Sequence, residues 1–219
     1  RDLRMSRGLG DVYKRQYKID NEKINIGINI SSLLWDSQWA KENHFGLTVD
    51  YEQYHIKILE WIMEQSKYII HIIPHVIDLE QPDARENDYR VCLQLKKKYG
   101  NRVEIAPPFN TPIEAKSYIA NMDVFIGSRM HATIGAISSG VATIPFSYSR
   151  KFEGLFGNLE YPYVISARNF SLEEALEKSK SWIQNYEILK ECGQKSVVES
   201  YAKLELLEND IRCLLEKRK

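Results

Sequence analysis

The sequence has little cysteine and no excess of charge of either sign. Its 219 residues include three cysteines, Cys92, Cys192 and Cys213, and their wide spacing indicates neither a disulfide framework nor a thiolate metal site. A reducing, cytoplasmic setting fits this cysteine content best. Thirty basic and thirty acidic residues give a formal net charge of +0, so we expect no nucleic-acid partner and no attraction to an anionic membrane surface.

Long apolar runs and targeting signals are also missing. The longest apolar stretch, residues 68–73, is interrupted by His71. It falls far short of the roughly 20 residues that a membrane-spanning helix needs, so no transmembrane segment is predicted. The amino terminus has no apolar core followed by small residues, and it is therefore not a secretory signal peptide.

The first 16 residues differ from the rest of the chain. They carry five basic and two acidic side chains and show neither helical nor strand periodicity. They resemble translated adaptor or assembly-junction sequence, and the alternative is a disordered basic arm. We exclude residues 1–16 from the fold and assign residues 17–219 to one domain. If the first interpretation holds, the natural protein is longer than this chain.

From Lys23 onward, apolar runs of strand length alternate with stretches of helical period. This alternation predicts an α/β fold, a doubly wound parallel sheet of the Rossmann-like kind, and 43% hydrophobic residues suffice for its core. The six predicted strands are residues 24–30, 68–73, 102–106, 123–127, 141–146 and 163–165. Predicted helices are residues 49–66, 88–99, 111–122, 129–139, 171–189 and 196–217. A long polar and aromatic loop follows the first strand, and a flavodoxin-like receiver is the runner-up fold.

Local signals support several of these helix ends. Thr111 followed by Pro112 is a helix-start pair, because the hydroxyl caps the helix and the proline ring needs no N–H partner in the first turn. Gly100 suits the position just past a helix end. Ser171 with Glu174 predicts a capping box.

The richest candidate site follows the fourth predicted strand. Ligands of open α/β sheets bind beyond the carboxyl ends of the strands, and the segment GSRMHATIGAISSG begins at such an end. We expect Ser128 to cap the next helix, and Arg129 and His131 to lie in its first turn, where the dipole and free N–H groups favour an anion. A guanidinium and an imidazole there would form a cradle for phosphate or carboxylate. Alternatively, Arg129 forms a surface ion pair and His131 is a buried, hydrogen-bonded imidazole.

Further cations follow the neighbouring strands. Arg150 and Lys151 are adjacent in PFSYSRKFEGLFG, where they either extend the anion site or are solvated loop charges. His75 follows the second strand at the same edge. His71 and His75 are four residues apart, but Pro74 and the strand setting deny them the helical register of a zinc pair, so no metal is predicted. Neither GxGxxG nor GxxxxGK[ST] is present, which disfavours NAD and nucleoside triphosphates.

The segment SRMHATIGAISSGVATIPFSYSRKFEGLFGNL resembles the carboxy-terminal signature of the polysaccharide pyruvyl transferase family. The preceding HIIPHVID and APPFNTPIEAKSYIANMDVFIGSRMHA agree with it, and the resemblance covers about residues 24–165. It implies one half of a two-domain GT-B-type glycosyltransferase fold. It also implies transfer of a pyruvyl group from phosphoenolpyruvate to a saccharide hydroxyl as a ketal, with no further cofactor. The chain would be the donor-binding half, inactive without a missing amino-terminal half.

The resemblance also assigns roles to residues. It implies that Arg129 and His131 contact the donor, and it matches Arg150 and Lys151 to a basic loop of the family. We hypothesise that Arg129 clamps the donor while His131, the sole histidine in the cradle, shuttles a proton or binds the departing phosphate.

One feature departs from the family pattern. Several members end the first strand of this half with an arginine, whereas this chain has Ser31 and Ser32 there, which puts the identity of the donor in doubt. Two other functions stay open. One is a GT-B-type glycosyltransferase or nucleotide-sugar enzyme, and the other is a non-catalytic ligand-binding module.

Overall fold

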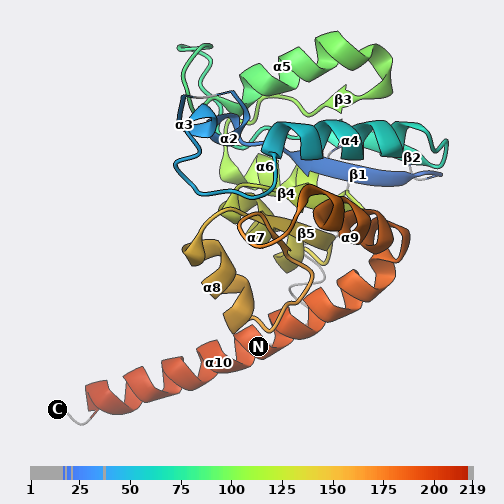
Figure 1. Cartoon of the computed structure of the whole chain (residues 1–219). Coiled ribbons are helices and arrows are strands. Elements are labelled where there is room, and N and C mark those ends of the chain that lie inside the picture. Colours follow the sequence, from blue (N-terminus) through green and yellow to red (C-terminus); the bar gives the residue numbers. More distant parts are fainter. Residues whose placement is uncertain (1–16, 18, 21, 37, 217–219) are drawn as a thin grey trace.

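The computed structural model describes residues 17, 19, 20, 22–36 and 38–216, and the predicted tail of residues 1–16 lies outside them. Its centre is a parallel sheet of six strands in the order β3-β2-β1-β4-β5-β6 (Figure 1). The strands are β1 (Ile24–Asn29), β2 (Tyr68–Ile72), β3 (Glu104–Ile105), β4 (Val124–Gly127), β5 (Ala142–Ser147) and β6 (Ile165–Ser166). The predicted α/β class with a doubly wound parallel sheet is confirmed.

The strand order reverses between β1 and β4. The chain runs outward from β1 through β2 to β3 and then crosses back to β4, so Ile26 of β1 pairs with Ile70 on one side and Val124 on the other. Loops leaving the carboxyl ends of β1 and β4 therefore diverge to opposite sides, and this is where open α/β sheets commonly bind their ligands.

Helices cover both faces of the sheet. On one face, α4 (Tyr51–Met63), α5 (Asp88–Tyr99) and α9 (Leu172–Gln184) bury their apolar sides in the larger core cluster. On the other face, α6 (Pro112–Ile119) and α7 (Met130–Ser138) pack on a second cluster that contains Phe125. The two clusters bury both faces of the sheet, which accounts for the strand-length runs of branched residues.

The predicted helix caps are present. Thr111 accepts a hydrogen bond from the backbone N–H of Glu114, and Ser171 and Glu174 form the reciprocal capping box. Gly100 has a φ of 61°, the left-handed region that a side chain disfavours. These short-range signals were correct because each cap depends on a few neighbouring residues.

Two segments that the sequence treats as loops contain helices. The segment after β1 folds into α2 (Ser32–Trp35) and α3 (Gln38–Lys41). After β5, α8 (Arg150–Asn158) begins at Ser149, whose side chain accepts from the N–H of Phe152. Phe152 and Phe156 are buried one turn apart, and this apolar contact outweighs the low helix propensity of two glycines in α8.

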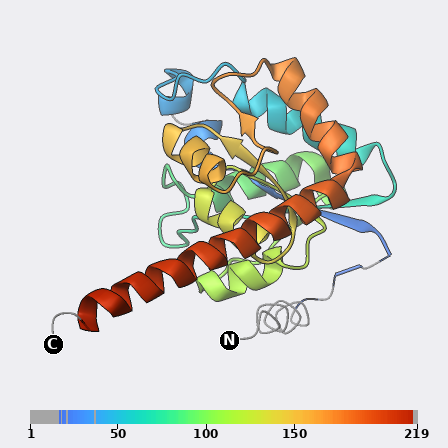
Figure 2. The ribbon, with the colours of Figure 1, turned by 90° about the horizontal axis from the view of Figure 1, so that it is seen from below.

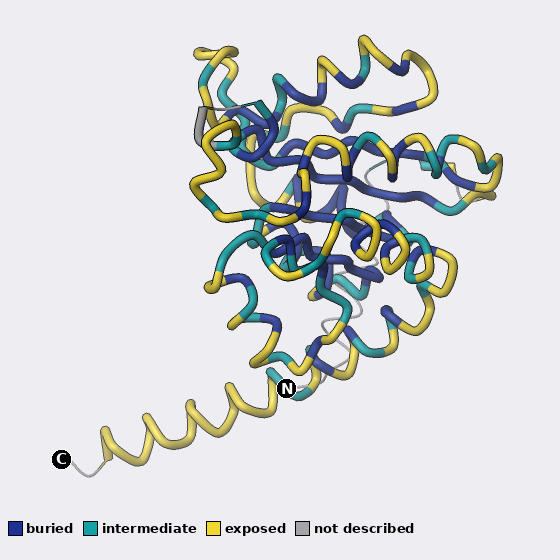
Figure 3. Tube along the Cα trace, viewed as in Figure 1, coloured by how far each residue is buried: buried dark blue, intermediate teal, exposed yellow. Residues whose placement is uncertain are grey.

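The carboxy-terminal region also differs from its prediction. β6 is residues 165–166 rather than 163–165, and the last helix, α10 (Tyr186–Glu216), begins ten residues before the predicted start at 196. α10 packs against β5 and α7 through its first turns and then projects away from the domain (Figures 1 and 2). Residues 201–216 are exposed on all sides (Figure 3), including Leu204, Leu207 and Ile211.

None of the helices among the described residues is long and apolar enough to cross a bilayer.

Two imidazoles are held neutral inside the domain. His55 is fully buried among aromatic rings, and its Nδ1 lies 2.9 Å from the carbonyl oxygen of Tyr51. His71 on β2 lies between the Tyr118 hydroxyl and the Asn25 amide oxygen, at 2.9 and 3.0 Å. Burial lowers the pKa of each histidine from 6.5 to about 4.

We predict that the protein loses stability as the pH falls from 6.5 toward 4. In this window the unfolded chain binds protons at both histidines and the folded chain does not, so protonation favours unfolding. Each site should contribute about 2–3 kcal/mol, following the size of its pKa shift. Urea unfolding at pH 7 and pH 4.5 measures the effect. His55→Phe should lose less stability than wild type between these two values, because it lacks one of the two buried protonation sites. Equal pH dependence in the two proteins would contradict the prediction.

Candidate functional site

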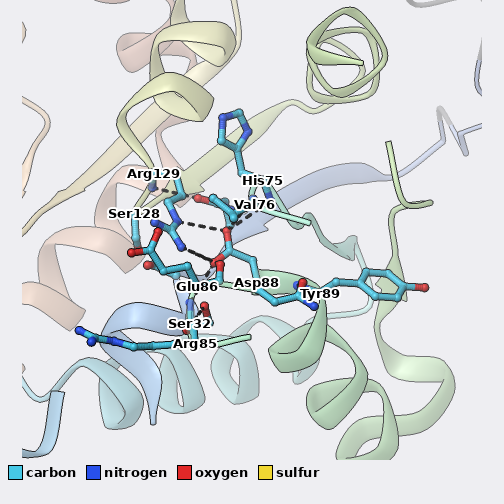
Figure 4. A network of polar contacts seen from close by, with 12 residues as sticks. Ser32, His75, Val76, Arg85, Glu86, Asp88, Tyr89, Ser128 and Arg129 are labelled. Atoms are coloured by element: carbon cyan, nitrogen blue, oxygen red, sulfur yellow. Dashed lines mark hydrogen bonds and ion pairs between the residues drawn. The ribbon is translucent and has the colours of Figure 1, made fainter. Parts of the chain in front are cut away.

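A buried polar network joins the carboxyl ends of β1, β2 and β4, with Asp88 at its centre (Figure 4). Asp88 is the first residue of α5 and is 0% exposed. Its carboxylate accepts hydrogen bonds from the N–H groups of Ser32, at 3.0 Å, and Val76, at 3.1 Å. A carboxylate in the first turn of a helix is also stabilised by the helix dipole. Asp88 therefore ties together the segments that follow β1 and β2.

Arg129 is the charge partner of Asp88. Its Nη2 and Nε lie 2.8 and 3.2 Å from the two carboxylate oxygens, and Nη2 also donates to the carbonyl oxygen of Glu86. Burial alone would lower the pKa of the Arg129 guanidinium, but the hydrogen bonds and charge of Asp88 hold it above its ordinary value. The ion pair that we considered for Arg129 thus exists, but it is largely buried, with 12% of the arginine side chain exposed.

One nitrogen of the Arg129 guanidinium, Nη1, takes no part in this network. Nη1 forms no hydrogen bond with any residue that the structure describes. Because the other two nitrogens are held by Asp88, the direction in which Nη1 can donate is fixed in advance. A planar guanidinium held in this way can bind a carboxylate or phosphate without reorganising.

The backbone before Arg129 is positioned by Asn29 and Gly127. Asn29 at the end of β1 is fully buried, and its amide oxygen accepts the N–H of Arg129 at 2.9 Å while its Nδ2 donates to the carbonyl of Ile73. A Cβ on Gly127 would lie 2.7 Å from the Thr133 side chain. Glycine is therefore needed here for α7 to pack this close to β4.

Ser128 does not cap α7, which corrects the sequence prediction. The N-cap residue is Arg129, and no side chain caps the helix. Ser128 is 0% exposed, and its Oγ accepts a hydrogen bond from the Tyr51 hydroxyl at 2.7 Å. That hydroxyl also accepts the N–H of Ser31. Ser128 follows β4 directly, and its hydroxyl points into the interior toward Tyr51. Its role in substrate binding remains a prediction.

His131 is the second residue of α7 and is exposed, so the alternative of a buried imidazole is wrong. Its side chain makes no hydrogen bond or ion pair with the described part of the chain. Since α7 lacks a side-chain cap, its first-turn N–H groups are available to an anion beside this imidazole.

His75 lies at the same edge and is partly buried. Its backbone N–H is 3.4 Å from the carboxylate of Asp88, and its Nδ1 has no partner among the described residues. Burial lowers the pKa of His75, the carboxylate of Asp88 opposes this effect, and the positive charge of Arg129 adds to it. Within the described residues, no group of three or more His, Cys, Asp or Glu side chains could hold a metal ion.

Arg150 and Lys151 lie in the first turn of α8 rather than in a loop, and both are exposed. Neither forms a hydrogen bond or an ion pair with another described residue. α8 follows β5, the neighbour of β4, so these cations share the edge with Arg129. Ser31 and Ser32, at the position where the family resemblance leads us to expect an arginine, are buried, and the Ser32 hydroxyl donates to the carbonyl oxygen of Arg85.

Sequence reasoning missed three members of the network: Asp88, Asn29 and Tyr51. In the sequence, Asp88 is only the first residue of the predicted helix 88–99, and its partner lies 41 residues further on. Asn29 could have been identified from the sequence, because a polar residue near the end of a branched apolar strand needs a hydrogen-bond partner inside the protein.

Comparison with known proteins gives a family match and a set of structural neighbours. The family model for polysaccharide pyruvyl transferases matches residues 14–150. No curated protein matches the chain. Among solved structures, WaaG, a glycosyltransferase involved in lipopolysaccharide biosynthesis, aligns with a TM-score of 0.53 and 13% identity over 86% of this chain. The aligned part is 45% of WaaG, so the chain spans under half the length of that protein.

Two further structures have the same fold. The C-terminal domain of the group 1 glycosyltransferase LpcC from Francisella tularensis aligns with a TM-score of 0.53 and 14% identity, over 89% of this chain and 97% of that domain. The α,α-trehalose 6-phosphate synthase from Burkholderia multivorans aligns with a TM-score of 0.54 and 10% identity, over 98% of this chain and 50% of the synthase. The sheet and its helices therefore have the Rossmann-like fold found in one half of GT-B glycosyltransferases.

We predict that Asp88→Asn lowers the free energy of unfolding by about 3–5 kcal/mol, because the change leaves the buried Arg129 charge unpaired. The matched control is Asp36→Asn. Asp36 forms a bidentate pair with Arg90, but both side chains are partly exposed, at 32% and 21%, so we expect a loss of about 1 kcal/mol or less. Urea denaturation of both variants measures the difference. Similar losses in the two variants would show that the Asp88 pair is not effectively buried.

Proposed function

Since the chain belongs to the polysaccharide pyruvyl transferase family, we propose that it transfers a pyruvyl group from phosphoenolpyruvate to a saccharide as a ketal. The observation that carries the proposal is the geometry of Arg129. A guanidinium fixed by Asp88 at the carboxyl edge of the sheet presents one free donor beside an uncapped helix start. Such a site favours a small anion over a neutral ligand.

The negative charges of phosphoenolpyruvate are complementary to the positive side chains at this edge of the sheet. Phosphoenolpyruvate carries a phosphate and a carboxylate, so its site needs several positive groups that are already in place. Arg129 and the start of α7 would bind one anionic group. His131, Arg150 and Lys151 are exposed at the neighbouring helix starts and would bind the other.

The reaction requires a proton donor and stabilisation of the leaving group. A proton adds to the methylene carbon of the donor, two saccharide hydroxyls form bonds to its central carbon, and the bond from that carbon to the phosphate oxygen breaks. One of the two hydroxyl protons balances the proton taken up by the methylene carbon, and the other leaves with the phosphate. We assign proton transfer or phosphate binding to His131, whose exposed imidazole can reach a bound ligand.

We also propose that a second, amino-terminal half completes the active site. The chain aligns with 45% of WaaG and with 50% of the trehalose 6-phosphate synthase. The projecting part of α10 presents Leu204, Leu207 and Ile211 to solvent, an apolar surface that a facing half could cover. The three cysteines are free, which suits the cytoplasmic setting predicted for the enzyme.

A glycosyltransferase is the second candidate, because the solved structures with this fold include glycosyltransferases. Its donor would be a nucleotide sugar. Titration of the chain with phosphoenolpyruvate and with UDP-glucose separates the two functions. Binding of the nucleotide sugar alone would favour the glycosyltransferase, and binding of neither would favour a non-catalytic module.

We predict that His131→Ala and Lys151→Ala each weaken phosphoenolpyruvate binding by about 10-fold, as expected for the loss of one charge-assisted hydrogen bond. Both side chains are exposed, so the fold should be retained. Isothermal titration measures the affinity. Lys97→Ala is the matched control, because this exposed lysine lies in the last turn of α5, at the opposite end of the helix from Asp88. A loss of affinity equal to that of the control would contradict the assignment.

In the complete enzyme, His131→Ala should lower kcat by on the order of 10²-fold if the imidazole transfers the proton. Steady-state turnover at saturating donor measures this effect. If kcat stays within a few-fold of wild type while donor affinity falls, His131 binds the donor and another group moves the proton.

A further inference from the structure

A cavity of about 410 Å³ lies next to the Arg129 network and is not used by the donor site described above. It is lined by residues between Leu34 and Glu52, the segment that connects β1 to α4. This volume is in the range of small-molecule sites. The loop that forms it is long for a compact domain, and such loops commonly serve binding.

Two contacts connect the cavity with the Arg129 site. Tyr51 lines the cavity, and its hydroxyl donates to Ser128, the residue before Arg129. Phe45 lines another part, and its ring packs edge-on against Tyr148, with 5.2 Å between ring centroids. Tyr148 directly follows β5, the strand that pairs with β4. These two contacts place the cavity next to the segment that carries Arg129.

The lining combines apolar rings with free polar groups. Phe45 contributes a partly exposed ring, whereas Trp35 lines the cavity with a largely buried one. Lys41 and Glu52 are exposed at the lining and form no hydrogen bond with a described residue. Aromatic surface bordered by a few polar groups suits a sugar ring, whose C–H face is apolar and whose hydroxyls both donate and accept hydrogen bonds.

The charges of the cavity differ from those of the donor site. Asp50 and Glu52 bring two carboxylates to the lining and Lys41 brings one ammonium group. This balance disfavours a multiply charged anion, whereas the edge around Arg129 favours one. The cavity and the edge around Arg129 therefore favour ligands of different charge.

We propose that this cavity binds the acceptor saccharide, with a neutral hexose unit against Phe45 and its reacting hydroxyls directed past Tyr148 toward the donor at Arg129. The assignment rests on the proposed pyruvyl transfer, and it adds which part of this chain recognises the acceptor. Glu52 accepts from saccharide hydroxyls and Lys41 donates to them.

Saturation-transfer NMR of the full 219-residue chain tests the proposal, with the methyl glycosides of glucose, galactose and mannose as probes. At least one glycoside should bind. Phe45→Ala and Glu52→Gln should each raise its Kd by about 5–10-fold, the effect of losing one ring contact or one charged hydrogen bond. Phosphoenolpyruvate affinity should not change in either variant.

The matched control is Glu64→Gln, which makes the same change at an exposed position at the other end of α4. Glu52 is exposed, so Glu52→Gln tests the cavity even if Phe45→Ala fails to fold. No glycoside binding, or equal binding by wild type and both cavity variants, would overturn the assignment.

Binding of UMP that is lost in Glu52→Gln and displaces the glycoside would assign the cavity to a nucleotide and overturn the proposal. Glycoside binding that depends on Phe45 and Glu52, without any phosphoenolpyruvate binding, would support the saccharide cavity while the proposed donor fails. The two failures are thus distinguishable.

Discussion

The candidate site depends on one interaction, the buried ion pair between Asp88 and Arg129. Its two residues lie at the starts of two different helices, α5 and α7, and the carboxylate also accepts hydrogen bonds from N–H groups in the segments after β1 and β2. A buried ion pair is weak evidence for stability, because apolar residues of similar size often stabilise a fold equally well. What apolar residues cannot supply is a guanidinium with a fixed direction and one unused donor. The pair is therefore best explained by positioning.

The topology of the sheet determines where this pair can form. The order β3-β2-β1-β4-β5-β6 places the ends of β1 and β4 side by side while their following helices lie on opposite faces. Asn29 joins the two strand ends by accepting the N–H of Arg129. Gly127 lets α7 approach β4 closely enough for its open first turn to lie at the same edge. The position of Arg129 thus depends both on the local requirement for glycine at position 127 and on the order of the strands in the sheet.

Much of the fold was predictable because its signals are local. The branched runs predict the strands, and Thr111 and Ser171 mark helix starts through hydrogen bonds to residues three positions away. α8 was missed because its glycines weaken the propensity signal, while the burial of Phe152 and Phe156 that stabilises it depends on the rest of the core. Tertiary packing overrode local preference there.

The site was predictable only in part, because its side chains are held by contacts between residues far apart in the sequence. The order of residues predicts that Arg129 and His131 follow a strand, and both do. It could not reveal that the two differ in environment, with the guanidinium held by a buried carboxylate and the imidazole exposed. Asp88 lies 41 residues before its partner, and nothing in the sequence between them specifies the contact. Ser128 was misassigned as a cap because its hydroxyl partner, Tyr51, lies 77 residues away.

The ion pair also has a consequence for how an anion would be attracted. Because Asp88 neutralises Arg129, the pair contributes little net charge, and Arg129 offers direction rather than long-range attraction. Long-range attraction of an anion to this edge would therefore come from exposed cations such as Arg150 and Lys151. Exposed charges are screened by salt within about 10 Å at 0.1 M ionic strength, whereas a buried hydrogen-bond donor is affected much less. Attraction and orientation of the ligand are thus assigned to different residues. A neutral saccharide in the neighbouring cavity would not be attracted by these exposed cations, so the proposed donor and acceptor would be recognised independently of each other.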